Sequence, residues 1–182
     1  VIIQNRLGWL RVHDWIYGRL FEIETLRSEL LAAGIKDMVL LGMGGSSLAP
    51  EVIRAILGSR PSWLRLHVLD STDPAAIYAV DTPAKHTLVI VASKSGTTIE
   101  PVSLAAAFRK RLIDAGIEDW AAQFVAITDA DTELAVHAHT ERFRDVFINP
   151  SDIGGRYSAL SFFGLVPASL LGLDVSALIG WG

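Results

Sequence analysis

The chain has 182 residues, a net charge of −4 and no cysteine. This length suffices for one well-packed domain and is short for two ordinary ones, while 51% hydrophobic and 20% charged residues exclude a disordered chain. The lack of cysteine excludes a disulfide scaffold and a thiolate metal site, and it is compatible with the cytoplasm, where we expect the protein to act. Without a basic excess or a membrane-length apolar run, we expect neither nucleic acid nor a membrane as partner.

The hydrophobic pattern predicts one helix followed by alternating strands and helices. Apolar side chains recur at helical spacing over residues 12–33, and Gly34 follows as a helix stop. Short apolar runs predict buried strands at residues 38–41, 64–69, 87–91, 124–127 and 145–148. The stretches between and after them predict helices at residues 48–57, 74–80, 100–115, 132–140 and 157–171.

This alternation predicts an α/β fold, a three-layer αβα sandwich with a five-stranded parallel sheet. We expect one domain at residues 35–182, with residues 1–34 as an N-terminal helical extension packed on it. The predicted helix 157–171 is apolar almost all round, so we expect a second domain or another subunit to cover it. The chain also begins at Val1 and not at a methionine, which suggests a piece of a longer protein.

Two loops rich in glycine and hydroxyl residues follow the first and third predicted strands. They read Gly-Met-Gly-Gly-Ser-Ser at residues 42–47 and Ser-Lys-Ser-Gly-Thr-Thr at residues 93–98. Glycines let backbone N–H groups approach an anion, hydroxyls donate further hydrogen bonds, and a helix N-terminus carries partial positive charge. In a flavodoxin-like strand order, 2-1-3-4-5, both loops flank the point where strand order reverses. The sequence therefore predicts a phosphate site there.

Two other interpretations of these loops stay open at this point. Serine and threonine are common in ordinary helix caps and turns, although two such loops at neighbouring strand ends make that explanation weaker. The first loop also approaches the dinucleotide fingerprint, with Asp70 at the end of the second strand as a ribose-binding acid. However, Ser47 replaces the third glycine, and a dinucleotide fold does not require a hydroxyl-rich loop after its third strand.

A third loop, residues 149–156, ends in Gly154-Gly155-Arg156. The planar guanidinium of Arg156 suits a phosphate or a developing oxyanion, and a helix-end salt bridge is the alternative. His137 and His139 are two residues apart on a predicted helix and point in different directions, so we expect no metal site.

Together the three motifs, at residues 42–50, 93–100 and 154–158, resemble the glucose-6-phosphate isomerase family, specifically the first of its two sugar-isomerase (SIS) domains. Residues 147–156 are most similar to the isomerase part of bacterial bifunctional transaldolase/glucose-6-phosphate isomerase fusions. The resemblance runs from the first strand to the helix after Arg156, and it implies that residues 35–182 form an SIS domain that binds sugar phosphates.

The resemblance also implies roles for individual residues. Gly155 and Arg156 would lie at the reacting carbons, with Arg156 stabilising the charge of an enediol(ate) intermediate. No metal or other cofactor is implied, and the family's glutamate base matches no residue of this chain. The substrate phosphate would be held by Gly45, Ser46, Ser93, Lys94, Ser95, Thr97 and Thr98.

The resemblance implies a sugar phosphate as small-molecule partner, a second SIS domain in the full chain, and a homodimer as a further expectation. An isolated chain of this sequence is expected to lack isomerase activity. The alternative is an SIS module that senses a sugar phosphate for an attached regulator. A DNA-binding helix-turn-helix would distinguish the two, and none is visible in the sequence.

Overall fold

The structure, a computed structural model, describes residues 6–181, so residues 1–5 of the predicted extension and Gly182 lie outside the described residues. One parallel sheet runs through the molecule in the order β2-β1-β3-β4-β5. Its strands are β1 (Asp37–Gly42), β2 (Arg65–Leu69), β3 (Thr87–Ala92), β4 (Phe124–Asp129) and β5 (Asp145–Asn149). The five predicted strands, the α/β class and the 2-1-3-4-5 order are confirmed.

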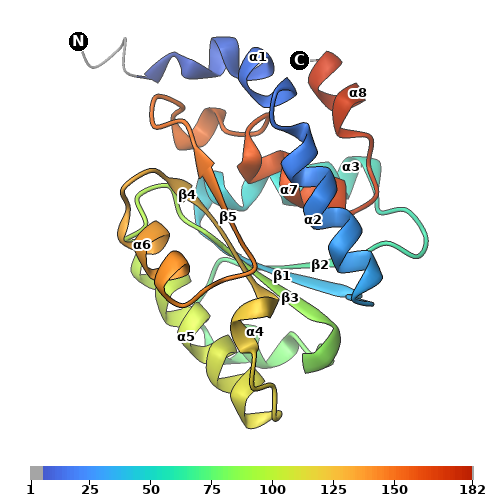
Figure 1. The fold of residues 1–182 in the computed structure, drawn as a ribbon, viewed down its shortest axis with the longest axis vertical. Coiled ribbons are helices and arrows are strands. Elements are labelled where there is room, and N and C mark those ends of the chain that lie inside the picture. Colours follow the sequence, from blue (N-terminus) through green and yellow to red (C-terminus); the bar gives the residue numbers. More distant parts are fainter. Residues whose placement is uncertain (1–5, 182) are drawn as a thin grey trace.

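Helices cover both faces of this sheet (Figure 1). One layer contains α1 (Val12–Tyr17), α2 (Leu20–Ala32), α3 (Leu48–Leu57), α7 (Phe162–Leu170) and α8 (Val175–Gly180). The opposite layer contains α4 (Pro74–Ala79), α5 (Ile99–Asp114) and α6 (Glu133–Thr140). Within β1, Met38 and Leu40 pack toward the first layer while Val39 and Leu41 pack toward the second. Burial on both faces explains why the strands read as continuous apolar runs.

Two helices differ from their predicted extents. The predicted helix 12–33 is divided into α1 and α2 at Gly18, where the N–H of Arg19 bonds the carbonyl of Ile16 at 2.9 Å. Glycine is a poor helix former, and the i to i−3 bond tightens the chain into a turn. The predicted helix 157–171 begins later, at Phe162, after a turn in which Ser161 N–H bonds Ser158 O at 3.0 Å. Helix α8 was not expected.

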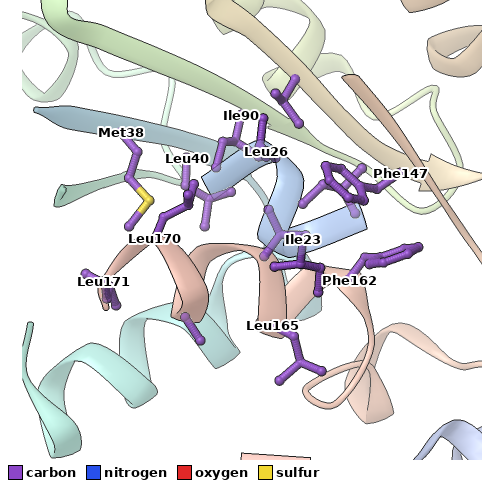
Figure 2. Packing of buried hydrophobic residues seen from close by; sticks show 14 of the residues in the cluster. Ile23, Leu26, Met38, Leu40, Ile90, Phe147, Phe162, Leu165, Leu170 and Leu171 are labelled. Atoms are coloured by element: carbon purple, nitrogen blue, oxygen red, sulfur yellow. The ribbon is translucent and has the colours of Figure 1, made fainter. Parts of the chain in front are cut away.

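Helix α7 is buried along its whole length, and this chain itself supplies its cover. It packs against α2, α3, α8 and β5. Figure 2 shows Phe162 of α7 close to Ile23 of α2, in the cluster that also contains Leu165 and Phe147. The expectation that a second domain or subunit must cover this helix is therefore wrong. The predicted division between residues 34 and 35 stays a prediction.

The loops after β1 and β5 meet through two glycines. A Cβ built on Gly45 would lie 2.1 Å from the carbonyl oxygen of Gly155, a distance that no real side chain occupies. Ser158 Oγ lies 3.2 Å from Gly45 O and 2.7 Å from Gly155 O, in position to donate to either carbonyl. Gly45 is thus required for the approach of the two loops, which brings residue 155 to the end of β1.

At the opposite edge of the sheet, Asp37 is buried beneath two basic residues of β2. Its carboxylate accepts a 2.7 Å hydrogen bond from Arg65 Nη2 and lies 2.9 Å from His67 Nε2. Burial alone would raise the pKa of Asp37, but the hydrogen bonds from Arg65 and His67 outweigh it and hold the pKa below its usual value. A group with a lowered pKa stabilises the fold only where it is ionised.

We expect Asp37→Asn to lower the free energy of unfolding at neutral pH by about 1–2 kcal/mol, the lower range for bonds to a charged group, because Arg65 is largely exposed. The difference from wild type should persist down to the ordinary aspartate pKa of 3.8. It should disappear as the pH falls through the lowered pKa of the folded state, where wild-type Asp37 is also neutral. Urea unfolding at a series of pH values measures this. Asp81→Asn, at a carboxylate that is 99% exposed, is the control, and an Asp37 difference that stays constant to the lowest pH would contradict the assignment.

Gly45→Ala and Gly155→Ala should have unequal effects, although the two glycines touch each other. A methyl group at residue 45 meets the backbone of residue 155, whereas a methyl at residue 155 meets no atom within 4 Å. We expect Gly45→Ala to lower stability by about 1–3 kcal/mol, as overpacking does, and Gly155→Ala to leave it nearly unchanged. Thermal unfolding of both variants is the measurement, and equal losses would mean that the loops do not pack this way.

Candidate functional site

A pocket of about 460 Å³ opens where the loops after β1, β3 and β5 meet, at the carboxyl edge of the sheet. This is the edge at which parallel sheets bind ligands, and β1 and β3 flank the point where strand order reverses. Serine and threonine hydroxyls, glycine backbone and one lysine line it. The predicted site residues among its lining are Gly45, Ser46, Lys94, Ser95, Thr98 and Gly155.

The loop after β1 presents backbone and one hydroxyl to this pocket. Gly44 has a φ of +54°, a conformation that glycine adopts without strain, and it turns the chain directly after the strand. Ser46 follows in a short 3₁₀ turn and lines the pocket although it is 9% exposed. Among the described residues its hydroxyl makes no hydrogen bond that the structure records, so it is available to a ligand.

Some hydroxyls of the loop after β3 line the pocket, and others bond residues within the loop. Ser93 Oγ is buried, accepts a hydrogen bond from Gly96 N–H at 3.1 Å, and donates to Thr98 Oγ1 at 3.2 Å. Thr97 Oγ1 donates to Ser95 Oγ at 3.2 Å. Only Ser95 and Thr98 of these residues line the pocket. The hydroxyls of Ser93 and Thr97 therefore bond other residues of the same loop, Ser93 from a buried position and Thr97 from an exposed one. A direct contact of either with phosphate stays a prediction.

Helix α5 begins at the wall of the same pocket. Thr98 is its N-cap residue, but the threonine side chain does not cap the helix. The first-turn N–H groups of Ile99 and Glu100 have no partner within the helix, and residue 101 is a proline without an N–H. Such a helix end carries partial positive charge and suits an anion.

Lys94 connects three loops through its ammonium group. It forms an ion pair with Asp129 at the end of β4 and donates a 3.0 Å hydrogen bond to the carbonyl of Ser151 after β5. The ammonium thus already has two protein partners at the pocket wall. Its predicted binding of phosphate stays a prediction, while its contacts with the protein hold the loops in place.

Burial raises the pKa of Asp129, and the hydrogen bond and charge of Lys94 oppose this effect without cancelling it. The charge of Arg6 also opposes it, more weakly. Asp129 Oδ1 is buried and has no hydrogen-bond partner among the described residues. Asn149, paired with Asp129 in the sheet, is 2% exposed and has both amide atoms unpartnered within the same part of the chain. Asp129 lines the pocket, and an unsatisfied buried polar atom at a pocket wall favours a bound water or ligand there.

Gly155 lines the pocket, and Arg156 follows it in a 3₁₀ turn, Gly155–Tyr157. The Arg156 side chain is exposed, is not among the lining residues, and forms no ion pair with any described residue. The helix-end salt bridge considered from the sequence is therefore absent from residues 6–181. Arg156 follows a lining residue directly in the chain, and its exposed side chain has no ion-pair partner among the described residues.

Four lining residues escaped sequence reasoning: Arg6, Met43, Asp129 and Ser151. Asp129 ends β4 and Ser151 follows β5, so the rule that ligands bind at strand ends could have indicated both. Nothing in the sequence pattern pointed to Arg6, which lies far from any predicted strand.

Two other hollows lie along α5, with volumes of about 400 and 600 Å³. Among the described residues, no serine or threonine lines either hollow, so neither offers a phosphate the hydroxyls that the pocket at the sheet edge offers. Within residues 6–181, no cluster of three or more acidic or histidine side chains is arranged to hold a metal ion. In the same residues, no helix has the length and apolar character needed to cross a membrane.

Known proteins share this sequence and fold. The phosphoglucose isomerase family profile matches residues 26–179. A glucose-6-phosphate isomerase of Thermus thermophilus is 37% identical over 182 residues, which cover 96% of this chain and 41% of that protein. The crystal structure of a hypothetical protein from the same species superimposes with a TM-score of 0.87 at 34% identity, covering 97% of this chain and 42% of that one.

A glucose-6-phosphate isomerase from Chlamydia trachomatis gives a TM-score of 0.74 at 34% identity, over 87% of this chain and 31% of the other. The chain thus spans less than half the length of these relatives. The match extends over the strand-end loops that form the pocket, and it argues against the dinucleotide interpretation of the first loop. The chain belongs to the phosphoglucose isomerase family.

Proposed function

We propose that this chain is the phosphate-binding part of an enzyme that interconverts glucose 6-phosphate and fructose 6-phosphate. The observation that carries the proposal is the pocket in which Ser46, Ser95 and Thr98 meet Gly155 from the third loop. Family membership supports the reaction, because the relatives named above include glucose-6-phosphate isomerases. No metal or other cofactor is part of the proposal, and a cytoplasmic location stays a prediction.

Moving a proton between C1 and C2 of a sugar requires three things: a base near the carbons, a stabiliser for the charged intermediate, and an anchor for the remote phosphate. We assign the anchor to the hydroxyls of Ser46, Ser95 and Thr98 together with the free N–H groups at the start of α5. We assign to Arg156 the stabilisation of the negative charge of the enediol(ate), because it follows the lining residue Gly155 and its exposed side chain forms no ion pair with any described residue.

The base is assigned to polypeptide outside this chain. Asp129 is the only carboxylate among the described lining residues, and Lys94 holds it in an ion pair. Asp152 shares a loop with Arg156 but is not a lining residue, and its side chain packs beneath Gly8 instead. An anchor and a stabiliser without a base make half of an isomerase site.

The exposed face of α3 supports a second domain as the source of the missing base. Leu48, Val52 and Ile56 are spaced four residues apart and are 59%, 45% and 75% exposed, so they form one apolar stripe on the helix. The stripe begins two residues after Ser46, beside the pocket. We assign as its cover the polypeptide equivalent to the part of the relatives that this chain does not match. The predicted homodimer remains a prediction.

Combining Ser95→Ala with Thr98→Val should weaken sugar-phosphate binding without unfolding the protein. Hydrogen bonds to a charged group contribute roughly 1.5–3 kcal/mol each, so the double variant should bind at least about tenfold less tightly. Calorimetric titration with 6-phosphogluconate measures the affinity. Thr140→Val, which removes a hydroxyl bonded to the backbone of α6 far from the pocket, is the control. Unchanged affinity of the double variant would remove the loop after β3 from the site.

The proposed function itself is tested by assaying glucose 6-phosphate turnover in the full-length protein that contains this chain, and in this chain alone. We expect turnover by the full-length protein and none at an enzymatic rate by the chain alone, because general acid–base catalysis is worth about 10²–10⁴ in rate. Turnover by the chain alone would place the base within these 182 residues. Tight binding without turnover by the full-length protein would support the sugar-phosphate sensor instead.

A further inference from the structure

The segment before α1 is fixed to the loop that carries Gly155 and Arg156. Leu7 forms an antiparallel bridge with Ile153, and the N–H of Gly8 bonds the carbonyl of Asp152 at 3.2 Å. In Figure 1 this blue segment lies beside the orange loop that follows β5. The beginning of the described chain and the loop after the last strand therefore form one local structure.

Side chains reinforce this attachment on both sides of the bridge. The ring of Trp9 stacks on that of Tyr157, with centroids 5.4 Å apart and planes inclined by 17°. A Cβ built on Gly8 would lie 2.3 Å from Asp152 Oδ1, so the backbone at residue 8 rests directly on that carboxylate. Stacking of this geometry is favourable beyond the area that it buries. The attachment holds Arg6, two residues before Gly8, at the wall of the pocket.

Two cationic residues, Arg6 and Lys94, are found among the described residues that line the pocket, and their protein contacts differ. The Lys94 ammonium is bound by Asp129 and by the carbonyl of Ser151. Arg6 is exposed and forms no ion pair with any described carboxylate, although its charge acts on nearby Asp129. An anion that enters beside Ser95 and Thr98 thus meets Lys94, whose charge is already paired with Asp129. It also meets Arg6, which forms no ion pair with a described carboxylate.

We propose that Arg6 is a substrate-binding residue whose guanidinium binds the phosphate of the sugar phosphate in the pocket that it lines with Ser95 and Thr98. The inference rests on the proposed function, because it adds a residue to the same site. A guanidinium is suited to this role, since its planar fork donates two parallel hydrogen bonds to phosphate oxygens. The N-terminal segment then has a functional part, and it connects the phosphate anchor to the loop that carries Arg156.

The test compares Arg6→Gln, Arg6→Lys and Arg11→Gln in the full-length protein. Arg11 is the matched control, because it is exposed, lies in the same segment and does not line the pocket. We expect Arg6→Gln to raise the KM for glucose 6-phosphate about 10- to 100-fold, as the loss of one hydrogen bond to a charged group would, with kcat nearly unchanged. Arg6→Lys should recover part of the affinity, and Arg11→Gln should leave KM unchanged.

A second measurement separates this inference from the proposed function. Calorimetric titration of inorganic phosphate into the same variants requires no turnover, and Arg6→Gln should bind phosphate more weakly than wild type and Arg11→Gln. That result supports Arg6 as a phosphate ligand even if the wild-type protein fails to isomerise glucose 6-phosphate, an outcome that would refute only the proposed reaction. Wild-type phosphate affinity and KM in Arg6→Gln would overturn the inference. Equal losses in Arg6→Gln and Arg11→Gln would also overturn it, because they would indicate general attraction by surface charge.

Discussion

The backbone contact between Gly45 and Gly155 is the constraint on which the pocket depends. Their loops follow β1 and β5, which are separated in the sheet by β3 and β4. With neighbouring strands about 4.8 Å apart, these two strand ends lie roughly 14 Å from each other, so the loops must lean across the sheet edge to meet. They meet only because residue 45 has no side chain, and the Ser158 hydroxyl lies within hydrogen-bond distance of a carbonyl of each loop at the point of contact.

Charge at the site is local, because the chain as a whole carries −4 and does not attract an anion at long range. The ion pair of Lys94 with Asp129 uses one positive charge to hold three loops together. What remains for a phosphate is a set of neutral donors, the start of α5 and the exposed guanidinium of Arg6. In the proposed function, such a site would hold the phosphate by close hydrogen bonding and would serve as an anchor while the reaction occurs elsewhere on the sugar.

Helices α7 and α3 differ in how much of their apolar surface this chain covers. Helix α7 is buried within the chain, because α2, α3 and the sheet cover it. Helix α3 has one face on α7 and an apolar stripe on its exposed face, which begins at Leu48 beside the pocket. In the proposed function, a domain seated on that stripe would lie beside the pocket and would carry the base that the proposal assigns to polypeptide outside this chain. Helix α3 would then connect the proposed phosphate anchor to that domain.

The sequence by itself determined the strands, the parallel sheet and the loops that form the pocket, because these follow from local patterns. Apolar runs mark strands buried on both faces, and ligands collect at their carboxyl ends. Tertiary structure alone decided which hydroxyls face the pocket. Ser93 and Ser95 cannot be distinguished from the sequence, but in the fold Ser93 Oγ accepts a hydrogen bond from Gly96 N–H while Ser95 lines the pocket. Tertiary structure also decided that Lys94 pairs with Asp129, which lies 35 positions later in the chain. It likewise placed Arg6 at the pocket, through the bridge between Leu7 and Ile153, which are more than 100 positions apart. Contacts between residues so far apart cannot be inferred from local sequence spacing. The burial of α7 is a further example. An apolar helix predicts that it is buried, but only the tertiary structure shows which elements cover it.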